Sequence, residues 1–336
     1  MRHTAAPHWG SRRTQAARGG VTWAGIRRRC HRSGERSVYF AMQTPIFFSN
    51  DYVAAEYAFE TTRKAHDVNV SLLDEPVDGF VLRAPTPATR EELLLVHDAE
   101  YVDAVLTGEP RHLAESQGFS WDPRLATAVC SSTGGARDAV LAALGGQSGA
   151  GSLSSGLHHA RDGSGAGFCT FNGLVVAAIA AQSAGAQRVA ILDFDAHCGG
   201  GTASLILGRS GIEQHDVSVN AYDTYSETPN ARLVMSNGTT YLDDISEMLA
   251  TIPDPGSIDV AIYNAGMDPH EHAGGVAGIT TEMLAEREDR VFSWAARHNV
   301  PMAWVLAGGY THGMSLDELA GLHRLTAEAA KRHLLD

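Results

Sequence analysis

Three continuous apolar runs in the C-terminal half of the chain constrain its fold most strongly. They lie at 188–194, 258–266 and 301–309, and segments with helical patterns separate them. A short apolar run without polar alternation is typical of a strand that is buried on both faces, and such strands occur in parallel sheets covered by helices. We therefore predict an α/β fold, a single domain with a mostly parallel central sheet and helices on both faces.

Weaker signals extend this alternation of strands and helices along the chain. Two more strands are predicted, at 45–48 and 79–84. Helices are predicted at 123–144, 172–184, about 240–251 and 281–298. Two Ser/Thr-x-x-Glu capping boxes, which begin at Thr89 and Ser315, predict the starts of two further helices, the first of them running through Leu95. In a sheet of this kind ligand sites lie beyond the carboxyl ends of the strands, so we expect the chemistry to follow each apolar run.

Charge is distributed unevenly between the start of the chain and the rest. Residues 1–41 contain nine Arg, no Lys and one acid, Glu35, so their formal charge is +8. The remaining residues have a formal charge of −21, which gives the chain its net charge of −13. An acidic body of this size argues against direct binding of nucleic acid, because phosphate groups require a positive surface. It suits cationic substrates.

Residues 1–41 also lack any strand pattern and any amphipathic run of useful length. We expect a basic, disordered extension at 1–41 and one folded domain at 42–336. An organelle transit peptide and a nucleic-acid-binding arm are the alternatives for the extension. A secretory signal is not expected, because no apolar stretch follows the charges.

The cysteines and the longest apolar run indicate in which part of the cell the protein is found. The four cysteines are scattered and form no C-x-x-C pair, so neither a disulfide framework nor a zinc ribbon is indicated. The longest apolar run, 174–181, is too short to span a bilayer. We therefore expect a cytoplasmic protein without membrane association, with organelle targeting by 1–41 as the alternative.

Acidic and imidazole side chains follow the first two apolar runs. Asp195 and His197 are two residues apart, so they face the same way on an extended backbone, and this pair suits zinc. Asp268, after the second run, would supply a third ligand and leave a position open for water. Taken singly, these residues could equally be a helix-capping Asp, a surface His and a loop Asp.

Two further motifs supply groups for acid–base chemistry. Gly308 and Gly309 let the backbone turn tightly after the third run, and the hydroxyl of Tyr310 could stabilise a developing oxyanion. In the adjacent pair His158 and His159, one imidazole could act as a general base while the other stays protonated. The plainer alternatives are a turn with a packed aromatic residue and two loop histidines.

Together these motifs resemble the histone deacetylase and acetylpolyamine amidohydrolase superfamily. The order tandem His, D-x-D-x-H, G-x-D and G-G-Y is similar to that family's pattern, as are the stretches 93–106 and 167–178. The resemblance covers about 45–330 and implies an arginase-like α/β fold with a deacetylase-like catalytic domain. It implies a zinc-dependent hydrolase that removes an acetyl or longer acyl group from acyl-lysine or acetylpolyamine. The alternative is a catalytically weakened member of the same fold that binds acyl-lysine.

The resemblance also implies a role for each motif residue. The zinc ligands would be Asp195, His197 and Asp268. The catalytic groups would be His159 as general base and acid, His158 as its electrostatic partner, oriented by Asp193, and Tyr310 as the group that polarises the scissile carbonyl. No second D-x-D set is present for a binuclear manganese site, which argues against a ureohydrolase.

Further residues match the family's substrate and potassium sites. Phe168 with Gly167 would form one wall of a narrow acyl-lysine tunnel, and Asp122 would hold the substrate backbone at the rim. The residues that would bind a structural potassium ion are Asp193, Asp195, His197, Ser218 and Val219.

The chain departs from the family at Gly200, where a carboxylate usually supports the second tandem histidine. We expect a water or a backbone carbonyl to take over that support, and His159 to titrate at lower pH as a result. The prolines that commonly precede the tandem histidines are replaced by Ser154 and Ser155. These departures resemble the small class IV branch of the family.

Overall fold

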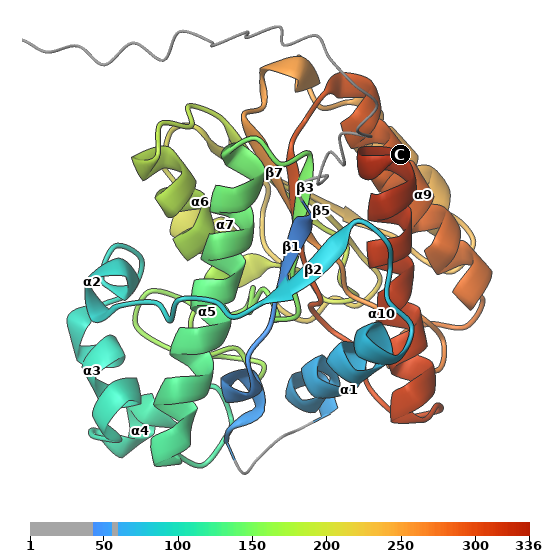
Figure 1. The fold of residues 1–336 in the computed structure, drawn as a ribbon. Helices are drawn as coiled ribbons and strands as arrows, with labels where there is room; N and C mark the ends of the chain where they lie inside the picture. Colours follow the sequence, from blue (N-terminus) through green and yellow to red (C-terminus); the bar gives the residue numbers. More distant parts are fainter. Residues whose placement is uncertain (1–42, 56–59) are drawn as a thin grey trace, which may run out of the picture. The chain divides into compact units, whose positions relative to one another are not determined.

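A parallel sheet of eight strands lies at the centre of the computed structural model, which describes residues 43–55 and 60–336 (Figure 1). The strand order is β2-β1-β3-β8-β7-β4-β5-β6, and every neighbouring pair is parallel. The strands are β1 (Thr44–Phe47), β2 (Phe80–Arg83), β3 (Gly149–Ser152), β4 (Val189–Asp193), β5 (Ile212–Ser218), β6 (Ala231–Met235), β7 (Val260–Asn264) and β8 (Met302–Val305). The predicted α/β class is confirmed. The predicted extension at 1–41 lies outside the described residues.

Helices cover both faces of this sheet. The α-helices are α1 (Glu60–Asp74), α2 (Arg90–Leu93), α3 (Ala99–Thr107), α4 (Arg111–Ala114), α5 (Pro123–Leu144), α6 (Gly173–Ser183), α7 (Gly200–Ile206), α8 (Tyr241–Ala250), α9 (Thr281–His298) and α10 (Leu316–Ala330). Shorter helical turns are η1 (Asn50–Val53), η2 (Pro255–Ser257) and η3 (Lys331–Leu335). None of the helices in the described part of the chain is long and apolar enough to cross a membrane.

Two hydrophobic cores lie on opposite faces of the sheet. Helices α1, α8, α9 and α10 bury apolar side chains in one core, and α3, α5, α6 and α7 do so in the other (Figure 1). Strand β4 contributes side chains to both cores. Ala190 and Leu192 belong to the first core, and Val189 and Ile191 belong to the second. Successive strand residues point to opposite faces, which explains why the predicted strand is apolar at every position.

Most predicted elements match the structure closely. The helix predicted at 123–144 is α5, and the other predicted strands and helices differ from the observed bounds by a few residues at most. Both predicted capping boxes are formed, at Thr89 and at Ser315. The helix that begins after Thr89 ends at Leu93, so the prediction that it runs through Leu95 was too long.

Strands β3, β5 and β6 were not predicted, and the first two have a clear physical reason. Strand β3 has the sequence GAGS, and a Cβ at Gly151 would lie 2.5 Å from the Trp304 ring, so this buried strand must be made of small residues. Strand β5 carries polar side chains that are nevertheless buried, namely Gln214, Asp216 and Ser218. Neither composition has the apolar pattern on which strand prediction depends.

The four adjacent strands β3, β8, β7 and β4 end level with one another. Ser152 pairs with Val305, Val305 with Asn264, and Asn264 with Asp193, and these four residues are the last of their strands. The loops that follow therefore leave the same edge of the sheet side by side, at its carboxyl ends.

A buried ion pair in α9 connects two of these loops. The guanidinium of Arg287 donates hydrogen bonds to the carbonyl oxygens of Phe194, at 3.1 Å, and Gly266, at 2.6 Å. Glu288 accepts a hydrogen bond from Arg287 and another, at 2.9 Å, from the hydroxyl of Tyr263. Because a guanidinium has fixed donor directions, this contact holds the loop after β4 at a set distance from the loop after β7.

Candidate active site

The loops after β3, β4, β7 and β8 bring the predicted motif residues into one pocket. Its lining includes the tandem histidines, two of the predicted metal ligands, the predicted tunnel residues and the tyrosine, together with groups that were not predicted. The lining residues are Ser155, Leu157, His158, His159, Gly167, Phe168, Cys169, Asp195, His197, Asn264, Ala307, Gly308 and Tyr310.

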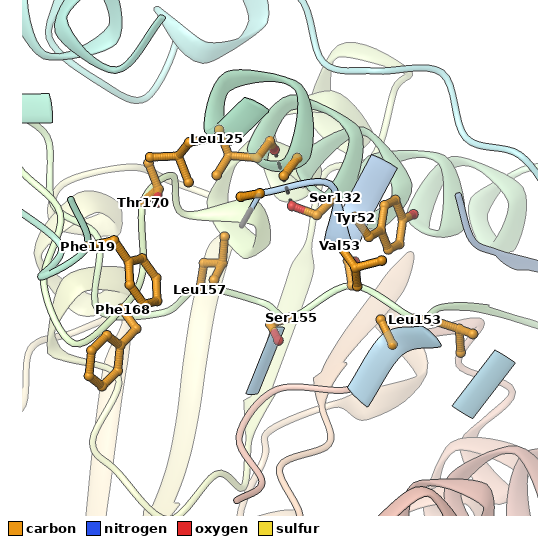
Figure 2. A pocket seen from close by; sticks show the side chains of 15 residues that line it. Tyr52, Val53, Phe119, Leu125, Ser132, Leu153, Ser155, Leu157, Phe168 and Thr170 are labelled. Atoms are coloured by element: carbon orange, nitrogen blue, oxygen red, sulfur yellow. Dashed lines mark hydrogen bonds between the residues drawn. The ribbon is translucent and has the colours of Figure 1, made fainter. Parts of the chain in front are cut away.

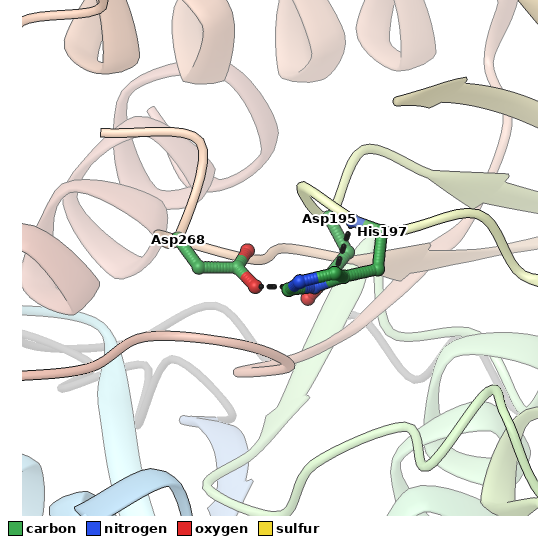
Figure 3. A group of neighbouring side chains, drawn as sticks. All are labelled: Asp195, His197 and Asp268. Carbon is green, nitrogen blue, oxygen red and sulfur yellow. Dashed lines mark hydrogen bonds and ion pairs between the residues drawn. The ribbon is translucent and has the colours of Figure 1, made fainter. Parts of the chain in front are cut away.

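Asp195, His197 and Asp268 form a compact group that could hold a metal ion (Figure 3). Each offers one ligand atom, and these atoms all lie within 4.8 Å of one another. The Nδ1 atom of His197 lies 3.2 Å from Asp195 Oδ1 and 3.1 Å from Asp268 Oδ2. Carboxylate oxygens and imidazole nitrogens are among the ligands that zinc takes in proteins, and three such groups would leave a position open for water.

The electrostatics of this group favour a positive charge at its centre. Asp195 and Asp268 are 2% and 0% exposed. Burial, and then the neighbouring Asp195 carboxylate, raise the pKa of Asp268 above its ordinary value. Burial alone would lower the pKa of His197, but the carboxylates of Asp195 and Asp268 raise it to about 11. Buried carboxylates that face each other need a cation between them, so the residues present fit a metal ion.

Backbone amides hold the carboxylates in place. Asp195 Oδ2 accepts a hydrogen bond from the Gly308 amide at 2.7 Å, and Asp268 Oδ1 accepts one from the Ala196 amide at 2.9 Å. The first bond ties the loop after β4 to the loop after β8, and the second ties it to the loop after β7. Each carboxylate thus keeps its other oxygen near His197, since Asp195 Oδ1 and Asp268 Oδ2 are the atoms that approach the imidazole.

The first tandem histidine, His158, lies in a strongly acidic environment. Its Nδ1 atom is 2.8 Å from Asp193 Oδ2, and its Nε2 atom is 3.6 Å from Asp195 Oδ1. Burial alone would lower the pKa of His158, but the charges on Asp193 and then Asp195 raise it to about 10. Asn264 donates a hydrogen bond to the other oxygen of Asp193 at 2.8 Å, which fixes that carboxylate. The structure thus brings Asp193 and His158 together as the sequence suggested.

The second tandem histidine, His159, shows that one sequence-based expectation was wrong. Its Nδ1 atom lies 3.0 Å from Asp223 Oδ2, so a carboxylate, rather than a water or a backbone carbonyl, stands beside it despite Gly200. Burial, and then the charge on His158, lower the pKa of His159 to about 4. The expected downward shift is therefore present, but burial and His158 cause it, while Asp223 acts in the opposite direction.

Tyr310 is half-buried at the edge of the same pocket. Its amide donates a hydrogen bond to the Ala273 carbonyl at 3.0 Å, and its ring meets the His197 ring edge-to-face at 6.5 Å. Burial, and then the charge on Asp268, raise the pKa of the Tyr310 phenol well above its ordinary value. The phenol therefore keeps its proton and can donate a hydrogen bond.

Two aromatic residues flank the pocket. Phe168 packs on Phe119 with ring centroids 5.1 Å apart, and Tyr222, which is 48% exposed, meets the His159 ring edge-to-face at 4.8 Å. Gly167 has φ +50°, and a Cβ there would lie 2.5 Å from the His159 ring, so only glycine fits. Tyr222 was not predicted as a site residue.

Backbone strain is concentrated at this pocket. Three non-glycine residues that line it, Leu157, Phe168 and Ala307, have φ of 58°, 64° and 54°. The left-handed conformation is costly for such residues and persists where the surroundings over-determine it. The ammonium of Lys64, which is buried in α1, donates a hydrogen bond to the Ala307 carbonyl and so helps to hold that conformation.

A second, apolar cavity of about 60 Å³ adjoins the pocket (Figure 2). Ser155, Leu157 and Phe168 line both spaces. The remaining wall is mostly apolar and comes from η1, α1, α5, the residues after β3 and the segments that precede α5 and α6. These residues are Tyr52, Val53, Ala55, Ala65, Phe119, Leu125, Ala128, Val129, Ser132, Leu153, Ser154 and Thr170.

Asp122 and three of the predicted potassium residues, Asp193, Ser218 and Val219, lie outside the pocket lining. Asp122 is buried and caps α5, accepting a hydrogen bond from the Arg124 amide at 2.7 Å and pairing with the Arg124 guanidinium at 2.9 Å. This capping accounts for its burial, and its role at the rim stays a prediction. Ser218 donates to Asp216 Oδ1 at 2.5 Å, and the Val219 amide donates to the Ala196 carbonyl at 2.9 Å.

Comparison with solved structures identifies the fold. The structure matches the HD domain of HDA15 with a TM-score of 0.70 and 22% identity, covering 87% of this chain and 91% of that one. It matches an acetylpolyamine aminohydrolase from Burkholderia pseudomallei with a TM-score of 0.67 and 18% identity, covering 86% of this chain and 99% of that one. The fold is thus that of the arginases and deacetylases.

The family follows from the sequence. The model of the histone deacetylase domain matches residues 57–325. The chain is also 28% identical over 302 residues to an uncharacterized protein of Picosynechococcus, covering 86% of this chain and 99% of that protein. The protein belongs to the histone deacetylase domain family and is a hydrolase of the deacetylase type.

We predict that the purified protein contains about one zinc ion per chain and that Asp268→Asn loses most of it. The substitution keeps the size of the side chain and removes one of the two buried charges that attract the metal. Asp243→Asn, at a side chain that is 90% exposed, is the matched control and should keep its zinc. Metal content is measured by mass spectrometry after dialysis. Full zinc content in a folded Asp268→Asn protein would contradict the assignment of the third ligand.

Proposed function

We propose that this protein is a zinc-dependent amidohydrolase that removes an acyl group from an N-acyl amine such as acyl-lysine or acetylpolyamine. One observation carries the proposal. Three ligand atoms from Asp195, His197 and Asp268 lie within 4.8 Å of one another, beside a pocket lined by the tandem histidines and Tyr310. Membership of the deacetylase family supports the reaction class.

The residues that would hold the ion are Asp195, His197 and Asp268. A zinc ion held there would supply Lewis-acid chemistry toward the amide carbonyl and the attacking water. His159 takes the proton of the attacking water and later gives it to the departing amine, so the C–N bond breaks with no net change in protonation. Tyr310 donates its O–H to the oxygen that becomes negative during the attack.

The two histidines suit different tasks because their environments differ. A pKa of about 4 leaves His159 as the free base at neutral pH, ready to accept a proton. A pKa of about 10 leaves His158 protonated, as a positive charge beside the reacting groups. Groups whose environments push their pKa values apart are the usual basis for assigning base and acid roles.

We also propose the potassium site implied by the sequence, at Asp193, Asp195, His197, Ser218 and Val219. The end of β5 lies against the loop after β4, because the amides of Val219 and Asn220 both donate to the Ala196 carbonyl, at 2.9 and 2.8 Å. Asp216 adds a buried carboxylate nearby, and burial followed by the charge on Asp193 raises its pKa. This concentration of oxygen atoms supports a hard cation as ligand.

The apolar cavity supports acyl groups longer than acetyl. Ser155 and Leu157 line both the pocket and the cavity, and we propose that the acyl carbon chain extends from one into the other there. The wall of this cavity is mostly apolar, so it would favour the carbon atoms of an acyl chain over water. We therefore propose acyl chains longer than acetyl as preferred substrates.

The alternative is a protein that binds acyl-lysine without hydrolysing it efficiently. The geometry favours the enzyme, because a base, an acid and an oxyanion donor surround the metal-ligand group. A binding protein would have no need for His158 and His159 to have pKa values on opposite sides of neutrality. The net charge of −13 suits a cationic carrier, whether a lysine-rich peptide or a polyamine.

We predict that the protein hydrolyses N-acyl-lysine amides, with kcat/KM rising about fourfold for each methylene added from acetyl to hexanoyl. Each buried methylene contributes about 0.8 kcal/mol, which corresponds to that factor. The assay measures release of the free amine across a series of acyl lengths, with an N-acetylpolyamine as a second carrier. A chelator should abolish turnover, and added zinc should restore it.

Ala128→Phe tests the cavity directly, because Ala128 lines it. The variant should lose the preference for longer chains and keep its rate on acetyl-lysine, whereas Ala126→Phe, half-buried on the same helix, should behave as wild type. Rates that fall with every added methylene would show that the cavity does not hold the acyl chain. No hydrolysis of any amide by the zinc-loaded protein would favour the binding alternative.

Tyr310→Phe should lower kcat by about 100-fold or more, because it removes one donor to the oxyanion. Zinc content and substrate binding should change little, since the phenol ring remains. The measurement compares kcat, zinc content and binding of an acyl-lysine peptide in the two proteins. Near-normal turnover by Tyr310→Phe would rule out this role.

A further inference from the structure

Asp223 is a partly buried carboxylate that reaches the second tandem histidine from a different loop. Its Oδ2 atom lies 3.0 Å from His159 Nδ1 and accepts a hydrogen bond from the Gly201 amide at 2.9 Å. Its Oδ1 atom accepts a hydrogen bond from the guanidinium of Arg161. Its side chain is 9% exposed. Both oxygens are therefore engaged, and each has a defined partner.

The space around Gly200 shows that Asp223 replaces a side chain there. A Cβ at Gly200 would lie 2.2 Å from the Asp223 carbonyl oxygen and 2.7 Å from its Oδ1 atom. The loop that carries Asp223 is held close by a hydrogen bond from the Cys198 amide to the Tyr222 carbonyl at 3.1 Å. A side chain at 200 and the observed position of Asp223 exclude each other, so the glycine is a condition for this arrangement.

The backbone at Asp223 is also strained in a way that serves this contact. Its φ is 58°, in the left-handed region that non-glycine residues seldom adopt. Asp tolerates this region better than most residues, yet the conformation still needs support from its surroundings. The hydrogen bonds to Gly201, Arg161 and His159 provide that support.

We propose that Asp223 is the positioning residue for His159 and that Arg161 holds Asp223 in place. An ionised carboxylate only accepts hydrogen bonds, so His159 Nδ1 must carry the proton and donate to Asp223. The other ring nitrogen, Nε2, then keeps its lone pair for the water proton. This inference rests on the proposed hydrolytic function, and it places the supporting carboxylate 23 positions after Gly200 in the chain.

Arg161 is itself anchored by His97, a histidine from the stretch 93–106. The Asn172 amide donates to His97 Nε2 at 3.0 Å, so His97 Nδ1 carries the proton and donates to the Arg161 carbonyl at 2.7 Å. His97 is 3% exposed. The chain of contacts thus runs from a buried histidine through Arg161 and Asp223 to His159, and it gives that stretch a role in positioning the general base.

The kinetic test compares Asp223→Asn, Asp223→Ala and Arg161→Gln with wild type. Loss of an orienting partner typically costs about 10- to 100-fold, so kcat of the Asp223 variants should fall by that factor, with KM and zinc content nearly unchanged. Arg161→Gln should lower kcat in the same direction by a smaller factor. The control Asp162→Asn changes an exposed acid on the same loop as Arg161 and should be neutral.

Chemical rescue separates positioning from a merely structural role. Formate can enter the space left in Asp223→Ala and should restore part of kcat, while it should not raise kcat of wild type. Parallel loss of kcat, KM, zinc and melting temperature without rescue would assign Asp223 a structural role only. Unchanged kcat in Asp223→Asn would overturn the proposal, and unchanged kcat in Arg161→Gln would overturn the part that concerns Arg161.

A spectroscopic measurement tests the hydrogen bond between His159 and Asp223 without relying on enzyme turnover. In protein labelled with ¹⁵N-histidine, the proton on His159 Nδ1 should give a strongly downfield signal that disappears in Asp223→Ala, while the corresponding signal of His158 persists. The His159 signal is assigned with His159→Gln. A wild-type protein that shows this signal but hydrolyses no amide would refute the proposed function and leave the contact established. Persistence of the signal in Asp223→Ala would refute the contact.

Discussion

Buried negative charge at the carboxyl ends of β4 and β7 is the constraint on which the rest of the site depends. Asp195 and Asp268 are almost completely buried and approach the same imidazole, His197. A buried carboxylate costs several kcal/mol unless it is paired or bound to a cation. The amides of Gly308 and Ala196 satisfy the remaining oxygens, so the groups that stabilise the charge also fix the loops after β4, β7 and β8 relative to one another.

Buried positive groups complete this arrangement. His158 lies between Asp193 and Asp195, and its raised pKa is the counterpart of their charge. Lys64 contacts the strained loop at Ala307, and Arg287 holds the carbonyl groups of the two metal-ligand loops. A preorganised set of charges of this kind costs no reorganisation during the reaction, which is how an active site stabilises a developing oxyanion.

The predictable part of this site is the part that follows strand ends. Continuous apolar runs locate β4, β7 and β8, and their parallel pairing brings the residues after them together, so Asp195, Asp268 and Tyr310 could be predicted. Tyr222 and Asp223 could not, because they lie in an irregular loop and Asp223 meets a histidine 64 residues away. The glycine at 200 signalled a change, but only the structure shows which carboxylate replaces the missing one.

The central claim is that one metal ion binds where Asp195, His197 and Asp268 converge. Diffraction data collected on either side of the zinc absorption edge from crystals of the purified protein test it most directly. The account predicts one strong anomalous peak about 2 Å from a ligand atom of each of the three side chains. No peak there in zinc-saturated crystals, or a peak bound to other residues while these three remain close together, would contradict it.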